Sequence, residues 1–220
     1  MISNKNIVPV PTIHRLPLYL SFLKSIKTLE VKHISAPEIA KVLHIDSTQI
    51  TKDFSYLNIS GKTKIGYETI NLIKVIEDFL GYHIKRKAFI VGVGNLGLAI
   101  LKYDEFAIEG MEIIAGFDLA FKKANTEENN IKIYNVDEFA NRAKITPVDI
   151  GIIAVPAQEA QKVADLMVNS SIRAIWNFSA RPVSAPDYVI IENTSIDAGL
   201  AMIKWKLNKN KPLIYKNRIL

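Results

Sequence analysis

The chain has 220 residues, of which 49% are hydrophobic, so it is long and apolar enough for one large domain or two small ones with buried cores. It contains no cysteine, which excludes structural disulfides, thiolate metal sites and thiol redox switches. It shows no secretory signal and no apolar run of about 20 residues, so we expect a cytoplasmic protein without a membrane partner.

The formal net charge of +6 is unevenly distributed along the chain. Residues 1–87 carry about 13 Lys and Arg against 7 Asp and Glu, residues 88–202 about 9 against 15, and residues 203–220 about 6 against none. A basic front segment suits the phosphate backbone of nucleic acid. The alternative is an ordinary solvated basic surface.

The front segment predicts a helix-turn-helix. A first apolar helix is expected over residues 16–29. Ser35 and Glu38 form a capping box that starts a second helix, and Asp46 repeats the capping pattern with Gln49 to start a third. Two short helices joined by a tight turn are typical of this motif. Two apolar faces are expected to be buried: Ile39, Ala40, Val42 and Leu43 on the second helix, and Ile50, Phe54 and Leu57 on the third.

The third helix is the candidate recognition helix, because its outward face carries short polar side chains and one cation. These residues are Ser47, Thr48, Thr51, Lys52 and Ser55. Residues 60–67 are basic and contain two glycines, which predicts a wing whose Lys62 and Lys64 lie on DNA phosphate. The alternative is a three-helix module that binds a protein. A fourth helix is expected over residues 68–80, with Ile70, Ile73, Ile76 and Leu80 facing inward.

From residue 88 onward, apolar strands alternate with helical patterns. This alternation predicts an α/β domain with a parallel sheet covered by helices on both faces. The expected strands are residues 88–91, 113–117, 131–134, 150–155, 174–176 and 188–191. The expected helices are residues 95–103, 137–143 and 157–168. Ligands bind such sheets at the carboxyl ends of the strands.

A glycine fingerprint, Gly92-Val93-Gly94-Asn95-Leu96-Gly97, joins the first strand to the first helix, and Asp118 ends the second strand. Gly92 permits the tight turn, Gly94 lets the backbone approach a pyrophosphate, and Gly97 permits close packing of helix on strand. The N–H groups at Asn95 suit a phosphate. Asp118 accepts from ribose hydroxyls, which favours NAD(H) over NADP(H). The alternatives are a Rossmann domain that binds nothing and one that binds coenzyme A.

The part of the chain that follows the fingerprint offers no candidate acid–base group for hydride chemistry. All histidines lie in the front segment or the linker, and no Tyr-x-x-x-Lys pair follows the fingerprint. We therefore predict no catalytic residues, no metal site, and a sensor rather than an enzyme. The alternative is a small NAD-dependent oxidoreductase whose front domain binds a protein partner.

The order of several motifs resembles the Rex family of bacterial redox-sensing transcriptional repressors, over nearly the whole chain. The motifs are Arg15-Leu16-Pro17-Leu18-Tyr19, Lys52-Asp53-Phe54-Ser55-Tyr56, Gly66-Tyr67, the fingerprint with Val91, Tyr103 and Phe106, Phe117-Asp118, Val155-Pro156-Ala157, Ala160-Gln161 and Asn177-Phe178. The resemblance implies a homodimer that binds operator DNA when NAD+ predominates and releases it on binding NADH. The cofactor-binding residues are then expected to be Gly92, Gly94, Asn95, Leu96, Gly97, Tyr103, Asp118, Val155, Pro156, Asn177 and Phe178.

The resemblance also implies three parts: a winged-helix DNA-binding domain (residues 1–85), a Rossmann NAD(H)-binding domain (86–194), and a dimerisation helix with a basic tail (195–220). The C-terminal helix, at about residues 195–207, is expected to swap into the partner subunit. It carries an apolar stripe that needs to be covered, formed by Ile196, Leu200, Ile203 and Leu207. The alternative is that this helix packs on its own domain.

The chain departs from the family pattern at four places, one of which is Asn177-Phe178-Ser179-Ala180-Arg181-Pro182 in place of the family's Asn-Phe-Ala-Pro stretch. Thr51 stands where family members usually carry Arg, and the wing reads Gly61-Lys62-Thr63-Lys64 in place of Gly-Lys-Arg-Gly. Because arginine forms bidentate bonds to guanine and threonine does not, we expect a different operator preference or a weaker affinity for DNA. Ser195 stands where the family tends to carry an Asp that pairs with residues corresponding to Arg15 and Tyr103, so the coupling between cofactor and DNA is expected to change.

Overall fold

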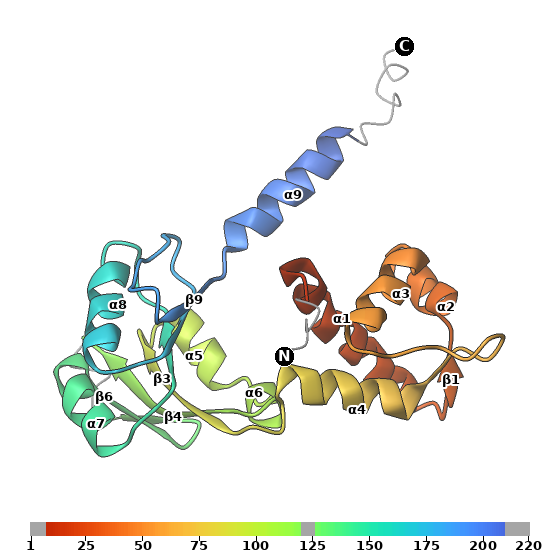
Figure 1. The fold of residues 1–220 in the computed structure, drawn as a ribbon. Coiled ribbons are helices and arrows are strands. Elements are labelled where there is room, and N and C mark those ends of the chain that lie inside the picture. Colours follow the sequence, from red (N-terminus) through yellow and green to blue (C-terminus); the bar gives the residue numbers. More distant parts are fainter. Residues whose placement is uncertain (1–7, 120–125, 210–220) are drawn as a thin grey trace, which may run out of the picture. The chain divides into compact units, whose positions relative to one another are not determined.

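A computed structural model describes residues 8–119 and 126–209 of the chain, which divides into a front unit, Met1–Ile84, and a rear unit, Lys85–Leu220. In its described residues, 8–84, the front unit contains four helices and a two-stranded antiparallel sheet, which can be followed in Figure 1. Its elements are α1 (Val10–Lys27), β1 (His33–Ile34), α2 (Ala36–Leu43), α3 (Ser47–Tyr56), β2 (Tyr67–Glu68) and α4 (Thr69–Leu80). This is the arrangement expected of a winged helix-turn-helix.

Helix α1 begins at Val10, so the predicted start at residue 16 is wrong. The first turn is stabilised by a contact that is distant in sequence, because Thr12 Oγ1 donates to Asp53 Oδ1 on α3 at 2.9 Å. From there α1 supplies Leu16, Tyr19 and Leu23 to the core, each fully buried. The extra turns therefore join α1 to the candidate recognition helix.

The predicted caps of α2 and α3 are present. Ser35 and Glu38 form the capping box of α2, and Asp46 accepts from the backbone N–H of Thr48 and Gln49 at the start of α3. The Gln49 side chain does not complete a second box, because its Nε2 donates to Asp53 Oδ1 at 2.9 Å instead. The predicted stripe of Ile50, Phe54 and Leu57 is buried.

The predicted burial of two apolar side chains is wrong. Val42 on α2 and Ile70 on α4 are 55% and 60% exposed. The buried face of α4 is instead formed by Thr69, Leu72, Ile73 and Ile76. These positions repeat at helical spacing, so the face is rotated by one residue from the predicted one, which placed Ile70 inside.

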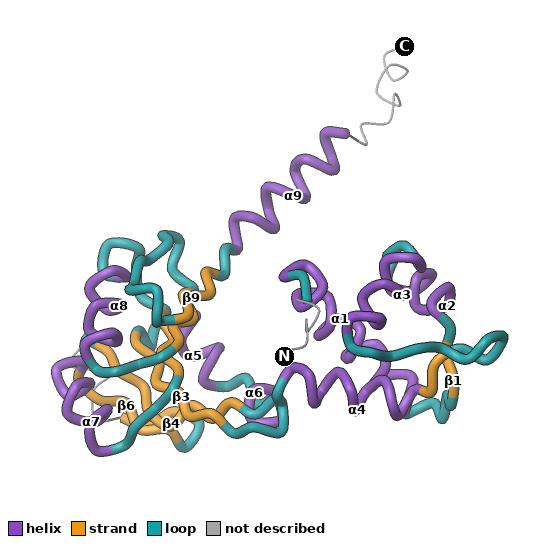
Figure 2. Tube along the Cα trace, in the orientation of Figure 1, coloured by secondary structure: helices purple, strands orange, loops and turns teal. Residues whose placement is uncertain are grey.

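The predicted wing is a short hairpin between α3 and β2 (Figure 2). Lys62 and Gly66 exchange backbone hydrogen bonds of 2.8 and 2.9 Å. Gly66 has a φ of +88°, and a Cβ at this position would lie 2.5 Å from the Ile34 carbonyl oxygen. Only glycine therefore permits the wing to lie so close to β1.

The rear unit contains a seven-stranded sheet in the order β5-β6-β4-β3-β7-β8-β9. All neighbouring strands are parallel except β5, which pairs antiparallel with β6 at the edge. The sequence did not predict β5, because its residues, Thr126-Glu127-Glu128, form no apolar run. The strands are β3 (Arg86–Val91), β4 (Met111–Asp118), β5 (Thr126–Glu128), β6 (Ile131–Asn135), β7 (Ile150–Ile153), β8 (Ala174–Asn177) and β9 (Ile190–Asn193).

Helices cover both faces of this sheet, as predicted (Figure 1). One face packs Phe89, Phe117 and Ile153 against α7 and α8, and the other packs Ile90 and Ile152 against α5. The helices are α5 (Asn95–Leu101), α6 (Glu105–Ile108), the 3-10 helix η1 (Val136–Glu138), α7 (Phe139–Ile145), α8 (Ala160–Asn169) and α9 (Ile196–Lys209). The chain builds outward from β3 to β4 and β6, then returns to β7 on the other side. The carboxyl ends of β3 and β7 therefore form a topological switch point, where ligands bind in this class of sheet.

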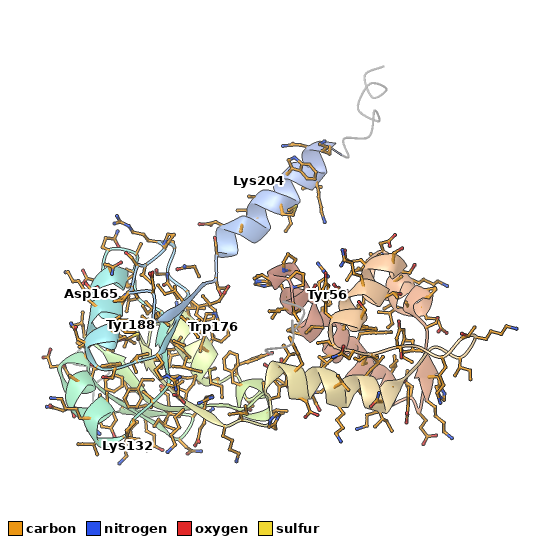
Figure 3. The ribbon with its side chains drawn as sticks, viewed as in Figure 1. Tyr56, Lys132, Asp165, Trp176, Tyr188 and Lys204 are labelled. Carbon is orange, nitrogen blue, oxygen red and sulfur yellow. The ribbon has the colours of Figure 1, made fainter. Side chains whose placement is uncertain are left out.

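Helix α9 follows the last strand. Its described side chains are all exposed, including Leu200, Ile203 and Leu207 of the predicted stripe, and Figure 3 shows Lys204 projecting from it. Packing on its own domain is therefore not seen in the described residues. The basic tail predicted after it, residues 210–220, lies outside the described residues. Within the described ranges, no helix is long and apolar enough to cross a membrane.

Candidate functional site

The glycine fingerprint forms a tight turn from β3 into α5. Gly92 has a φ of +95°, and a Cβ there would lie 2.5 Å from the Ala154 carbonyl oxygen. A Cβ at Gly97 would overlap the Gly92 carbonyl oxygen, whereas a Cβ at Gly94 would meet no atom within 4 Å. The packing roles predicted for Gly92 and Gly97 are confirmed, and the backbone at Gly94 faces open space that a ligand can enter.

A cavity of about 540 Å³ opens beside this turn, over the carboxyl ends of the strands. Asp118, at the end of β4, is half-buried in its wall, and its Oδ2 accepts from Val93 N–H at 2.8 Å. Asp118 therefore both braces the turn and faces the cavity. Most of the wall is aliphatic. The lining residues are Val91, Gly92, Gly94, Asp118, Leu119, Val136, Ala154, Val155, Pro156, Glu159 and Val163.

Of the predicted cofactor residues, Gly92, Gly94, Asp118, Val155 and Pro156 line this cavity. The structure does not bring the other predicted residues to its wall. Asn95, Leu96 and Gly97 belong to the first turn of α5, where Asn95 and Leu96 are exposed. The remaining three are Tyr103, Asn177 and Phe178.

Asn177 is fully buried, and its amide group holds the chain after β8. Its Nδ2 donates to the Arg181 carbonyl and to Asn193 Oδ1, both at 2.8 Å. Its Oδ1 accepts from the backbone N–H and the hydroxyl of Ser179, at 3.0 and 2.7 Å. The amide oxygen and nitrogen are thus both engaged, so Asn177 acts as a brace for the segment that carries Phe178.

Tyr103 and Phe178 lie at the two ends of a row of aromatic rings. The centroid distances are 4.7 Å from Tyr103 to Phe106, 5.5 Å from Phe106 to Trp176, and 4.6 Å from Trp176 to Phe178. Trp176 Nε1 donates to Thr194 Oγ1 at 2.8 Å, which fixes the position of the Trp176 ring. The row joins the segment after α5 to the segment after β8, and Tyr103 remains 52% exposed.

In the front unit, an open groove of about 790 Å³ runs between α3 and the wing. Four predicted DNA-binding residues line it: Thr51, Ser55, Lys62 and Lys64. Ser47, Thr48 and Lys52 lie on α3 but not in the lining of the groove. The Thr51 and Ser55 hydroxyls donate to backbone carbonyls within α3, at 3.0 and 2.7 Å. Their oxygens keep lone pairs for donors on a base edge or in water.

Sequence reasoning missed the buried carboxylate of α3, Asp53. It receives hydrogen bonds from Arg15 (two of 2.7 Å), Tyr19 (2.7 Å), Thr12 (2.9 Å) and Gln49 (2.9 Å). Two signals were available: Asp53 stands beside Phe54 on the apolar side of α3, and Arg15 and Tyr19 are one helical turn apart on α1. The cluster attaches the candidate recognition helix to α1.

The cluster shifts the pKa of each ionisable member. Burial acts to raise the pKa of Asp53, but the hydrogen bonds from Arg15, Tyr19, Thr12 and Gln49 outweigh it and hold the pKa below its usual value. The hydrogen bond to Asp53 raises the pKa of Arg15. Burial, and then the bond to Asp53, raises the pKa of Tyr19. The ionised carboxylate and guanidinium therefore stabilise each other.

The chain is similar to known proteins in both of its units. A family described as "Putative DNA-binding protein N-terminus" matches residues 7–55, and "CoA binding domain" matches residues 83–181. The redox-sensing transcriptional repressor Rex of Bacteroides fragilis is 42% identical, over 93% of each chain. The Rex repressor of Treponema denticola is 34% identical, over 95% of this chain and all of its own. The chain belongs to the Rex family.

Solved structures agree with this assignment. RSP, a Rex-family repressor in complex with NAD+ and operator DNA, has a TM-score of 0.85 and 30% identity, over 94% of this chain and 95% of its own. RSP in complex with NADH has a TM-score of 0.84 at the same identity, over 94% and 97%. The predicted fold class, a winged helix-turn-helix followed by a Rossmann domain, is confirmed. Members of the Rex family are transcriptional repressors.

Proposed function

We propose that this Rex-family protein is a dimeric transcriptional repressor that binds palindromic operator DNA and releases it when NADH binds. The observation that carries the proposal is that one chain of this family combines a groove beside a recognition helix with a dinucleotide-type turn and cavity. The front unit contacts DNA and the rear unit holds the cofactor. Because its Rex relatives in Bacteroides fragilis and Treponema denticola are bacterial proteins and bacterial operator DNA lies in the cytoplasm, we place the protein there.

The residues of the rear unit fit NAD(H). The backbone at Gly94 faces open space and leaves room for a pyrophosphate beside the first turn of α5, where Asn95 and Leu96 stand. Asp118 presents a carboxylate to ribose hydroxyls, and Val155 and Pro156 supply apolar wall. Tyr103 and Phe178 would meet the nicotinamide half if the aromatic row closes over it. The cofactor supplies a redox signal, and the rear unit, which has no histidine, does not catalyse a reaction.

The front unit contacts DNA with two kinds of residue. Lys52, Lys62 and Lys64 hold phosphate, and the hydroxyls on α3 approach base edges. These hydroxyls belong to Ser47, Thr48, Thr51 and Ser55.

Release of DNA requires a difference in affinity: NADH must prefer the conformation that DNA rejects. Helix α9 provides the link between subunits, because its apolar side chains are exposed in the single chain and fit a partner subunit. Arg15 already has a counter-ion, Asp53, within its own unit, and Ser195 Oγ accepts from Ala198 N–H at the start of α9. The coupling therefore differs from a family pattern in which an acid at position 195 pairs with Arg15.

The proposal is tested by selecting binders from a pool of random duplex DNA at moderate salt, without cofactor, with NAD+ and with NADH. The expected result is enrichment of a palindrome that NADH abolishes. Absence of enrichment in every condition, with NADH binding intact, would contradict the proposal that this chain represses transcription by binding operator DNA.

The DNA contacts make a separate prediction. Lys62→Ala should weaken binding to every sequence and reduce the slope of log affinity against log salt by about one, because one phosphate contact is lost. Lys132→Ala, on the exposed surface of the rear unit, is the matched control and should leave the slope unchanged. Titration of the selected operator at several salt concentrations measures this slope. An unchanged slope for Lys62→Ala would contradict the predicted contact between Lys62 and a DNA phosphate.

The match to a CoA binding domain favours a second candidate, a coenzyme A ligand at the same cavity. This candidate predicts measurable affinity for coenzyme A that Asp118→Ala leaves intact. NAD(H) binding predicts the opposite, a marked loss of affinity for NADH in Asp118→Ala, so calorimetric titration of both ligands separates the two.

A further inference from the structure

The cofactor cavity has a second acidic residue that the fingerprint does not include. Glu159 stands immediately before α8 and lines the same cavity as Asp118. Its side chain is 38% exposed, and Lys162 Nζ lies 3.2 Å from its Oε2. No interaction of its Oε1 is found among the residues that the structure describes. One carboxylate oxygen of Glu159 is therefore available to a ligand in the cavity.

The topology determines which part of a dinucleotide meets Glu159. The cavity lies over the carboxyl ends of β6, β4, β3 and β7, with the glycine turn after β3 at one wall. If the pyrophosphate lies at Gly94 and a ribose at Asp118, the base attached to that ribose enters the rest of the cavity. That remaining wall is aliphatic and suits a flat base. Its members are Leu119, Val136, Ala154, Val155, Pro156 and Val163.

Asp118 and Glu159 are the acidic groups of this wall. With Asp118 facing the ribose, Glu159 is left to face the base. Adenine carries an exocyclic amine, N6, whose N–H groups are donors, and a carboxylate oxygen accepts such a donor in a strong, charge-assisted hydrogen bond. In the deaminated base a carbonyl oxygen replaces the amine and N1 carries a proton, so a carboxylate placed opposite the amine loses its donor there and meets an oxygen instead.

We propose that Glu159 is a specificity-determining residue that recognises the adenine base of the cofactor by accepting a hydrogen bond from its N6 amine. This inference rests on the proposed binding of NAD(H). It predicts that the protein distinguishes NADH from its deaminated analogue, nicotinamide hypoxanthine dinucleotide, which carries a carbonyl at that position. We expect the full chain to bind NADH about tenfold more tightly than the reduced analogue, because the lost bond involves a charged group.

The test is calorimetric titration of NADH and reduced nicotinamide hypoxanthine dinucleotide into the full chain and its variants. Glu159→Gln and Glu159→Ala should reduce the preference for NADH to about twofold or less. Glutamine can turn its amide to meet either base, and alanine meets neither. Asp118→Asn should weaken both ligands by a similar factor and keep the preference, because both ligands carry the same ribose.

The matched control is Asp165→Asn, which removes one negative charge from the same helix. Asp165 lies on the outer side of α8 (Figure 3), accepts from Gln161 Nε2 at 2.8 Å and does not line the cavity. It should keep the full preference. Equal affinity of the unaltered chain for the two ligands, or a preference that persists in both Glu159 variants, would overturn the role of Glu159. Failure of both ligands to bind would overturn the proposed function itself.

Discussion

At the scale of single residues, the front unit depends on one buried carboxylate. Asp53 is fully buried and receives hydrogen bonds from α1 and from its own helix. A buried charge is tolerated only when it is paired and hydrogen-bonded, and this one has an arginine and three neutral donors. Asp53 therefore fixes the recognition helix on α1 and is a positioning residue for the groove.

Asp53→Ala should lower the free energy of unfolding of the front unit by about 3 kcal/mol, because it leaves Arg15, Tyr19 and Thr12 without their acceptor. Urea denaturation followed by circular dichroism at 222 nm measures this. Lys52→Ala, the exposed neighbour on the same helix, should change it by less than about 0.5 kcal/mol. Both tryptophans, Trp176 and Trp205, lie in the rear unit, so their fluorescence should report an unchanged rear unit. Equal stability of the two variants would contradict the role of Asp53.

The lowered pKa of Asp53 also makes the stability of the front unit depend on pH. A carboxyl group whose pKa is lower in the folded state stabilises the fold above its unfolded value, near 3.8, and this contribution is lost as the pH falls below that value. Glu38 acts in the same direction, because its bonds from Ser35 lower its pKa. Denaturation of the unaltered chain between pH 3 and 6 should show stability falling below about pH 4. In Asp53→Asn the loss of stability at low pH should be smaller. An identical pH profile of the two proteins would contradict the contribution of ionised Asp53 to stability.

At the scale of elements, the turn from β3 into α5 separates packing from binding. Gly97 is needed because its Cα lies against the Gly92 carbonyl, whereas Gly94 borders open space in the cavity wall. Neighbouring glycines of one motif therefore have different physical roles. The same contrast appears after β8, where Asn177 braces the backbone and Phe178 joins the aromatic row.

Two glycine variants should distinguish these roles. Gly94→Ala should leave the melting temperature within a few degrees of the unaltered chain but weaken NADH binding at least about tenfold, because the methyl group occupies space meant for the pyrophosphate. Gly97→Ala should lower the melting temperature, because helix and strand must separate to admit the methyl group. Differential scanning calorimetry and NADH titration measure both effects. The division into a binding role for Gly94 and a packing role for Gly97 is wrong if Gly94→Ala is the less stable variant.

At the scale of the whole molecule, helix α9 is the feature that a single chain does not explain. Leu200, Met202, Ile203, Trp205 and Leu207 are each at least half exposed. Exposed apolar surface of this kind usually marks a contact with another protein. A second copy of the chain is the partner that the Rex family implies, and two copies present two recognition helices to a palindrome.

The double variant Leu200→Glu, Leu207→Glu should convert the dimer to a monomer, because the two charges would be buried without partners in the interface. Sedimentation velocity of both proteins measures the mass. The front unit should keep its fold, and affinity for the palindrome should fall to that for a half-site. The paired substitution Lys204→Glu, Lys206→Glu, on the same helix, is the control for added charge. A dimer that persists in the leucine variant would exclude α9 from the interface.

Features that depend on near neighbours in the chain could be predicted from the amino-acid sequence. The capping box at Ser35, the turn at Gly92, the alternation of strands and helices, and the place of Asp118 at the end of its strand depend on short stretches of chain, because hydrogen bonds and backbone angles within a few residues decide them. The family resemblance rested on these same local motifs.

Features in which segments distant in sequence meet became visible only in the folded chain. Asp53 faces Arg15 and Tyr19 across 38 and 34 residues, and its hydrogen bond from Thr12 stabilises the first turn of α1. The buried face of α4, with Ile70 outside, was chosen by the helices packed against it. Glu159 reached the cofactor cavity because α8 follows the strand beside the glycine turn. Burial depends on which elements pack together, and the spacing of residues along one helix or strand does not contain that information.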